Sequence, residues 1–384
     1  MTRVSPAVGD RFVLERSDFP TFLARLRDRG YRVVGPTVRD GAIAYGEIRD
    51  ESDLPTGWTD RQEAGKYRLE RRSDAALFGY AVGPHSWKNY LFPSRERLWT
   101  GVRAGASFEI RPEESEGPPL AFLGVRACEM AAMDVSDRVF GKAGDPGYHR
   151  RRRKALRIAV QCGQAGGTCF CVSMGTGPAV RAGHDLALTE ILAPPRHYFL
   201  VEVGTAEGAA VLSGVPLSPA GPSDTASAEA VVAKTAASMG RTMDPAGLRD
   251  LLVNNPEHPR WEIVARRCLA CTNCTMACPT CFCNTSEEIP SLSGEETERW
   301  RRWDSCFNSG FSALHGSSVR ATTKSRYRQW LTHKLGTWHD QFGSSGCVGC
   351  GRCITWCPVG IDLTEEVAAI RVPAPLAAPA GGRP

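Results

Sequence analysis

The sequence lacks the marks of a membrane or secreted protein. No stretch approaches the about 18 consecutive uncharged apolar residues that a membrane-spanning helix needs. The first ten residues contain no apolar segment of the kind found in a signal peptide, so no secretory signal is visible. We therefore expect the chain to work in the cytoplasm, away from membranes.

Signatures of common catalytic and nucleotide-binding sites are also missing. No predicted strand is followed by G-x-G-x-x-G, and neither a G-x-x-x-x-G-K-S/T loop nor an H-E-x-x-H helix occurs. The net charge of +5 is modest for 384 residues and does not by itself imply binding to nucleic acid. These absences favour a protein that acts together with partners and has no catalytic residues of its own.

Cysteine is abundant instead. Fifteen cysteines are many for a cytosolic chain, and an odd number argues against a complete disulfide framework. Clustered thiols imply a reducing compartment, in which thiolates survive as metal ligands. The hydrophobic content of 42% and the charged content of 23% are otherwise those of an ordinary globular protein.

Eight of the cysteines form two copies of the spacing C-x2-C-x2-C-x3-C, each followed by proline. Bacterial two-cluster ferredoxins hold [4Fe–4S] cubanes with this spacing, and the fourth cysteine of each run ligates the other cluster. We therefore predict one cluster on Cys268, Cys271, Cys274 and Cys357, and a second on Cys347, Cys350, Cys353 and Cys278. Structural zinc is the alternative, but zinc sites use paired C-x2-C motifs and match this spacing poorly.

The expected fold class is α+β, with an N-terminal mixed α/β domain over residues 1–204 and a C-terminal α-helical two-cluster ferredoxin domain over 229–371. Short apolar runs broken by Gly, Pro and Asp predict strands in the first domain. We expect strands at 11–15, 31–34, 42–48, 66–71, 120–124, 156–161 and 197–203, with helices at 19–29 and 128–140.

Residues 205–228 are rich in Ala, Gly, Ser and Pro and are expected to form a loop or linker. After it, helices are expected at 229–239, 245–253, 261–267, 295–303 and 324–338. The long, helical insert between Cys278 and Cys347 is similar to the α-helical ferredoxins of succinate dehydrogenase iron–sulfur subunits and heterodisulfide reductase relatives. The last residues, 372–384, are expected to be disordered.

Seven cysteines lie outside the two runs. Cys128 follows the strand expected at 120–124, while Cys162, Cys169 and Cys171 follow the strand expected at 156–161. Since the ends of adjacent strands lie side by side, these four thiols could converge and hold a third [4Fe–4S] cluster. The alternative is that they are small buried apolar residues. Cys281, Cys283 and Cys306 are expected to pack beside the cluster loops.

Five blocks carry a family resemblance: residues 89–98, 123–132, 169–178, 278–283 and the closing motif at 347–358. Together they resemble the beta subunits of cytosolic sulfhydrogenases, which are soluble [NiFe] hydrogenases linked to NAD(P). The A subunit of anaerobic sulfite reductase is similar and shares the blocks. The resemblance spans about residues 10 to 370. Ala127-Cys128-Glu129 departs from the Pro-Cys-Asp that is common in the family, although it keeps the thiol and the acid.

The resemblance implies an electron-transfer subunit that relays electrons between a flavin-containing diaphorase subunit, which reacts with NAD(P)H, and the small and large subunits of a [NiFe] hydrogenase. The same relay in a sirohaem sulfite reductase, or in a related reductase, is the alternative.

A zinc-stabilised nucleic-acid-binding protein is a remote third possibility, resting on the basic run 150–154. That run lacks interleaved aromatic residues, so a solvated or protein-docking face is the simpler interpretation. The basic segment 320–334 is expected to offset the negative charge of the clusters.

Overall fold

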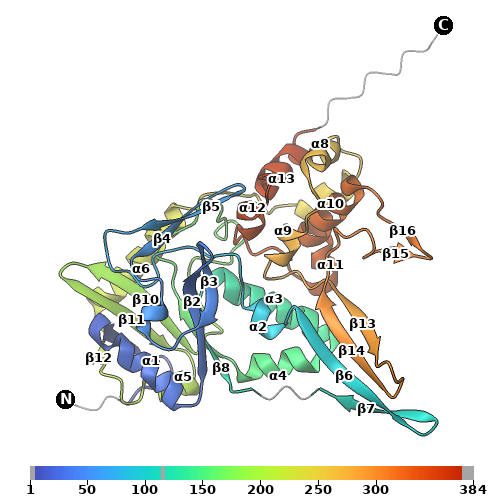
Figure 1. The fold of residues 1–384 in the computed structure, drawn as a ribbon. Helices are drawn as coiled ribbons and strands as arrows, with labels where there is room; N and C mark the ends of the chain where they lie inside the picture. The colour runs from blue at the N-terminus through green and yellow to red at the C-terminus, as the bar shows by residue number, and fades with distance from the viewer. Residues whose placement is uncertain (1–4, 114–116, 374–384) are drawn as a thin grey trace.

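An eight-stranded mixed sheet forms the centre of the structure, a computed structural model that describes residues 5–113 and 117–373 (Figure 1). The strand order is β12-β1-β11-β10-β9-β8-β2-β3. Strands β2, β8, β9 and β10 are mutually parallel, and β3 and β11 run antiparallel to their neighbours. The strands are β1 (Arg11–Glu15), β2 (Arg32–Arg39), β3 (Ala42–Glu47), β8 (Leu120–Val125), β9 (Leu156–Val160), β10 (Leu186–Ala193), β11 (Arg196–Val203) and β12 (Ser218–Pro219).

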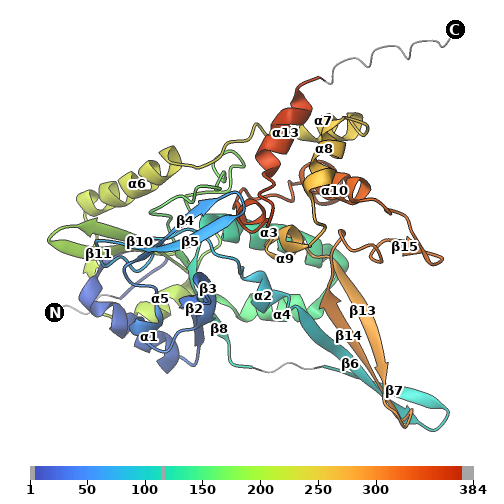
Figure 2. The same ribbon diagram turned by 45° about the horizontal axis from the view of Figure 1, so that its top comes forward.

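Helices cover both faces of this sheet. Phe12 and Leu14 of β1 join the core below α1 and α5, whereas Val13 between them packs with Ala228 of α6 on the other face. Figure 2 shows α6 and α1 on opposite sides of the sheet. Parallel strands need this double cover because both of their faces are apolar. The covering helices are α1 (Phe19–Asp28), α3 (Ala127–Ala143), α5 (Ala206–Leu212) and α6 (Pro222–Ala237).

A second sheet, in the order β13-β14-β6-β7, takes two strands from each half of the chain and projects away from the large sheet (Figure 1). Its strands are β6 (Arg95–Ala104), β7 (Ser107–Pro112), β13 (Asn284–Pro290) and β14 (Glu296–Trp303). The helix expected at 295–303 is therefore wrong. Alternate residues of β14 face opposite sides of the sheet, and Trp300 and Trp303 pack under Arg95 and Lys88 at 4.2 and 3.8 Å.

The remaining C-terminal elements are mostly short helices, so the second half is mixed rather than wholly helical. The expected helices at 245–253, 261–267 and 324–338 are present as α7, α8 and α10 with its continuation. The helices of this part of the chain are α7 (Leu248–Asn254), α8 (Arg260–Arg267), α9 (Asn273–Met276), α10 (Thr323–Thr332), a π-helix (His333–Thr337), α11 (Trp338–Phe342), α12 (Arg352–Thr355) and α13 (Leu363–Arg371). It also contains the hairpin of β15 (Ala313–Leu314) and β16 (Ser317–Ser318).

Residues 205–228 contain α5, β12 and the start of α6, because Ala209, Val211 and Leu212 are buried against the sheet. The disordered tail expected at 372–384 lies, from residue 374 onward, outside the described residues. The other elements are β4 (Trp58–Glu63), β5 (Lys66–Arg71), α2 (Lys88–Leu91) and α4 (Pro146–Lys154). None of the described helices is long and apolar enough to cross a membrane.

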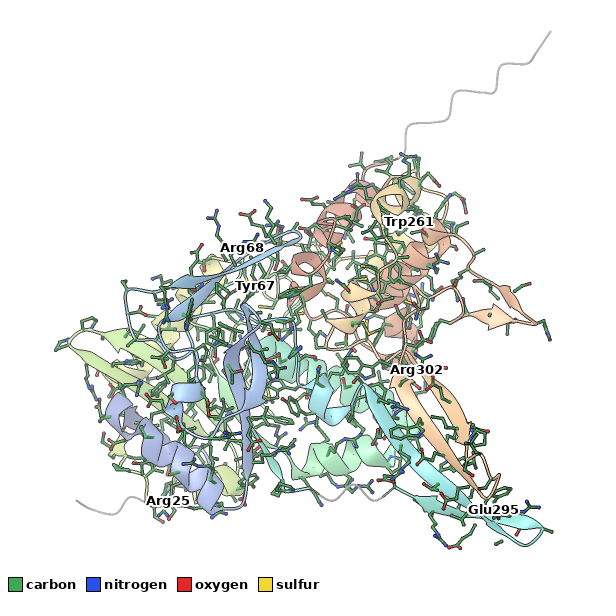
Figure 3. The ribbon with its side chains drawn as sticks, in the orientation of Figure 1. Arg25, Tyr67, Arg68, Trp261, Glu295 and Arg302 are labelled. Carbon is green, nitrogen blue, oxygen red and sulfur yellow. The ribbon has the colours of Figure 1, made fainter. Side chains whose placement is uncertain are left out.

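The loop that carries the second cysteine run packs backbone to backbone on the first half of the chain. A Cβ on Gly349 would lie 2.7 Å from the backbone of Cys171, and one on Gly351 would lie 2.4 Å from the carbonyl oxygen of Thr168. Both glycines have positive φ, which favours glycine. The β4–β5 hairpin adds a second contact, since Tyr67, labelled in Figure 3, stacks on Trp356 at 5.0 Å.

A buried ion pair fixes this contact. Arg352 Nη2 donates to Glu129 Oε1 at 2.5 Å, and the exposed fractions of the two side chains are 0% and 1%. Tyr45 Oη and Trp87 Nε1 also donate to the Glu129 carboxylate, at 2.7 and 3.1 Å to Oε2. Because each charge is buried and multiply hydrogen-bonded, losing one partner leaves the other uncompensated.

We predict that Glu129→Ala lowers the free energy of unfolding by about 3–5 kcal/mol, because it strands the Arg352 guanidinium in the interior. Urea denaturation followed by tryptophan fluorescence under anaerobic conditions measures the change. Glu109→Ala, which removes an exposed ion pair with Arg111, is the matched control and should leave the curve unchanged. Equal denaturation curves for the two variants would contradict a stabilising role for the Glu129–Arg352 ion pair.

Candidate metal centres

The first three cysteines of the first run and the last cysteine of the second run line one cavity. Cys268 and Cys271 lie in the turn between α8 and α9, Cys274 lies in α9, and Cys357 follows α12. Burial raises the pKa of Cys268 and Cys274, and the nearby Cys357 raises both further. Backbone N–H groups of Ala270 and Ile361 point at Cys268 Sγ and Cys357 Sγ at 3.4 and 3.3 Å. We call these four cysteines the first quartet.

Two polar side chains in the wall of this cavity lack partners. Tyr327 and Trp330 line the cavity and are 2% and 5% exposed. Among the described residues, neither Tyr327 Oη nor Trp330 Nε1 has a hydrogen-bond partner. A buried donor without an acceptor is costly. Sulfur atoms of a cluster held by the first quartet would supply acceptors, so the donor set and its wall fit an iron–sulfur group.

The second quartet consists of Cys347, Cys350 and Cys353 with Cys278 from the first run. Burial raises the pKa of Cys347 to about 12, with smaller contributions from Cys350 and Cys278. Burial likewise raises the pKa of Cys353, and its thiol neighbours are Cys347, Cys350, Cys278 and Cys274. Cys353 also borders the cavity of the first quartet, so the two quartets are adjacent.

A buried lysine contacts the second quartet. Lys334 Nζ lies 3.2 Å from Cys278 Sγ, and it also donates to Thr280 Oγ1 at 3.2 Å and to the carbonyl oxygen of Gly346 at 3.1 Å. Its exposed fraction is 2%, and no carboxylate pairs with it among the described residues. Lys334 lies in the π-helix after α10. The Cys281 thiol and this ammonium hold the pKa of Cys278 well below its ordinary value.

A second buried lysine lies on the other side of the same segment. Lys88 Nζ donates to the carbonyl oxygen of Cys281 at 3.1 Å and lies over the Trp303 ring. Burial lowers the pKa of Lys88, and the Cys281 and Cys278 thiols oppose that shift. Thiolates around Cys278 would balance the charge of both buried ammonium groups.

The third candidate group lies where β8 and β9 end. Cys128 begins α3 directly after β8, and Cys162, Cys169 and Cys171 lie in the loop after β9. Burial raises the pKa of Cys169 and that of Cys171, the latter to about 12. Cys162 and Cys350 contribute to both shifts, and Cys171 and Cys350 contribute to that of Cys128. The four thiols, which we call the third quartet, therefore lie together and beside Cys350.

Arg352 links the second and third quartets. Among the described residues, its guanidinium forms an ion pair with Glu129 and with no other residue. The Nη1 atom is buried and has no hydrogen-bond partner there. The thiols of Cys350 and Cys128 are among its neighbours. An unpartnered guanidinium N–H between two groups of thiols fits a site for an anionic cluster at this position.

Of the remaining cysteines, Cys281 lies next to Cys278, and Cys306 lies next to Cys283. A hydrogen bond from the Cys306 thiol lowers the pKa of Cys283 to about 7, and Cys281 hydrogen-bonds to Cys278. No group of three or more His, Cys, Asp or Glu side chains in residues 5–113 and 117–373 is arranged to hold a single metal ion.

Sequence reasoning missed several of these residues. Lys334 lies within the basic segment 320–334, whose charge was expected to offset the clusters, but its contact with Cys278 has no sequence signal. Arg352 and Glu129 are 223 residues apart, and nothing in either neighbourhood points to the other. In the basic run 150–154, Arg151 and Arg152 pair with Glu96 and Asp137, whereas Arg153 and Lys154 at its end are exposed.

We predict that Lys334→Met lowers the midpoint potential of the cluster expected at the second quartet. An N–H donor and a positive charge next to Cys278 Sγ stabilise the reduced, more negative state of a cluster, and the substitution removes both. A drop of several tens of millivolts is expected, since about 59 mV corresponds to 1.4 kcal/mol for one electron. Redox titration followed by EPR measures it.

Lys334→Arg, which keeps the charge, should shift the potential less. Lys324→Met removes a half-exposed lysine of the same helix and should not shift it. An unchanged potential in Lys334→Met would show that the ammonium acts only on folding.

Comparison with known proteins agrees with this geometry. Residues 267–361 match the family model described as a 4Fe-4S dicluster domain. Over 366 residues, covering 94% of this chain and 98% of the relative, the sequence is 27% identical to sulfhydrogenase 2 subunit beta of Pyrococcus furiosus. No solved structure matches the chain. The resemblance seen in the five sequence blocks is thus confirmed: the chain is an iron–sulfur protein with a 4Fe–4S dicluster domain and a homologue of a sulfhydrogenase beta subunit over almost its whole length.

Proposed function

We propose that the chain is the electron-transfer subunit of a soluble [NiFe] hydrogenase complex. In this role it relays electrons between a flavin subunit that reacts with NAD(P)H and the hydrogenase module. The iron–sulfur electron-transfer role follows from the dicluster domain and the homologue. The observation that carries the proposal is the chain of three adjoining cysteine groups, in which Cys353 borders the first quartet and Cys350 adjoins the third.

The proposed ligands are crossed between the two runs. Cys268, Cys271, Cys274 and Cys357 would hold one [4Fe–4S] cluster, and Cys347, Cys350, Cys353 and Cys278 a second. Each cluster, when bound, takes up and releases a single electron without proton chemistry. The common cavity of the first quartet, and the thiols that surround Cys353, support this assignment over two self-contained runs.

The third quartet, Cys128, Cys162, Cys169 and Cys171, would hold a third cluster. Its support is the proximity of these thiols and the unpartnered Nη1 of Arg352 beside them. The three sites then follow one another in the order third, second, first. Cys350 and Cys353, from one short loop, lie at the two junctions.

The surrounding residues perform two tasks in this relay. Lys334, Lys88 and Arg352 neutralise buried negative charge, so that adding an electron costs less in the interior. Apolar side chains line the cavity of the first quartet, and its wall includes Phe307, Ile361 and Leu363, although Cys271 is exposed. No catalytic residues are proposed.

We predict that Cys357→Ala removes the cluster of the first quartet, although residue 357 belongs to the second run. Iron should fall by about four per chain. The EPR spectrum of the reduced variant should match that of Cys268→Ala and differ from that of Cys347→Ala. Cys306→Ala, which removes a nearby thiol outside the quartets, should keep the full iron content. A match between Cys357→Ala and Cys347→Ala would overturn the crossed assignment.

The proposed function is tested by purifying the affinity-tagged chain anaerobically from its own cells. We expect about twelve irons per chain, matched by acid-labile sulfide, and co-elution of a nickel-containing partner. The double variant Cys169→Ala/Cys171→Ala should retain about eight irons. Co-elution of a sirohaem protein would favour the sulfite reductase alternative, and stoichiometric zinc without iron would favour the nucleic-acid-binding one.

A further inference from the structure

The three quartets differ in how close they come to the surface. Cys271 of the first quartet is the single exposed cysteine of the chain, and all fifteen cysteines lie in the described residues. In the second quartet Cys278, Cys347 and Cys350 are buried, and in the third quartet Cys128, Cys169 and Cys171 are buried. Electron transfer weakens steeply with distance, so the first quartet is the one best placed to exchange electrons with another protein.

The surface around Cys271 carries apolar side chains that nothing covers. Leu269, between two cysteines of the first quartet, is 64% exposed, and Ile263 on the preceding helix α8 is 40% exposed. Ala270 and Thr272, which follow Leu269 in the loop, both have positive φ. Exposed apolar groups at the edge of a functional site are typical of the centre of a protein interface.

The same surface is positively charged. Arg266 and Arg267 occupy the last turn of α8, directly before Cys268, and neither 266–274 nor 356–361 contains an acidic residue. Arg266 is exposed and has no ion-pair partner among the described residues. Arg267 donates to the carbonyl oxygens of Val359 and Gly360, so its charge is fixed across the two cysteine loops.

Nearby carboxylates do not cancel this charge. Glu366, which lies 3.9 Å from Arg267, is fully buried and also pairs with Arg260. Glu262 on α8 lies 3.9 Å from Lys324. We define the first-quartet face as Ile263, Arg266, Arg267, Leu269 and Cys271. These five residues are exposed and lie in one short segment that runs from α8 into the first cysteine loop.

We propose that the first-quartet face docks an electron-transfer partner whose own redox group is ringed by carboxylates. This inference rests on the proposed function and adds the terminus of the relay and the charge of the partner. Leu269 and Ile263 would meet an apolar patch of that partner, and Arg266 and Arg267 would steer its acidic rim. A weak redox complex needs only a small interface.

The test uses two haem proteins of opposite charge as probes, acidic cytochrome b5 and basic cytochrome c. In stopped-flow experiments one electron leaves the dithionite-reduced, desalted holoprotein and converts the probe haem from iron(III) to iron(II). We expect the rate with cytochrome b5 to fall as salt is raised, and the rate with cytochrome c to rise or stay constant. The opposite salt dependence would overturn the proposal.

Matched variants locate the contact. Arg266→Glu should slow the low-salt reaction with cytochrome b5 several-fold, whereas Arg153→Glu, the same change at another exposed arginine, should not. Leu269→Ala should slow it, whereas Leu314→Ala, at an equally exposed leucine (65%), should not. Equal effects within either pair would refute the site.

Iron content and EPR spectra of the same samples separate this inference from the proposed function. If the clusters are absent, the proposed function fails. If they are present and the paired variants behave alike, only the docking face fails.

Discussion

Neither cysteine run encloses its candidate cluster site without a residue from the other run. Cys357 completes the group begun by Cys268, and Cys278 completes the group begun by Cys347. The helices between the runs therefore have one main geometric task, which is to bring two distant loops together. Trp261, Tyr327 and Leu331 form the core that does so, and Lys334 follows on the same helical segment. Because of this mutual dependence, both cysteine loops must be in place before either group of four thiols is complete.

Burial of sulfur in this unit is balanced by cations from distant parts of the chain. Lys88 comes from the first half, Lys334 from between the runs, and Arg352 from inside the second run. Glu129, in turn, balances Arg352 and connects it to Tyr45 and Trp87. The charge network therefore follows the same path as the quartets, from the sheet of the first half to the helices of the second. Stability and electrostatics of the candidate relay depend on the same few contacts.

The sequence predicted those features that depend on local pattern. The seven expected strands, from 11–15 to 197–203, and the expected helices at 245–253, 261–267 and 324–338 are present, whereas β4, β6, β7 and β10 had not been predicted. Cys128 and Cys171, expected to converge from adjacent strand ends, are neighbours. Strand β14 was mistaken for a helix because its pairing with β6 is set by tertiary contacts nearly 200 residues away. The contacts of Lys334 and Arg352 were inaccessible for the same reason, since they join residues that no local pattern relates.

The four-stranded sheet has a consequence for how this protein can be divided. Because β6 and β7 come from the first half and β13 and β14 from the second, cutting the chain between the halves would leave two open sheet edges. A dicluster module excised at residue 267 would keep its ligands but lose the strand that covers β14, together with Lys88. Engineering that transplants the relay into another scaffold therefore has to carry the β6–β7 hairpin along with it.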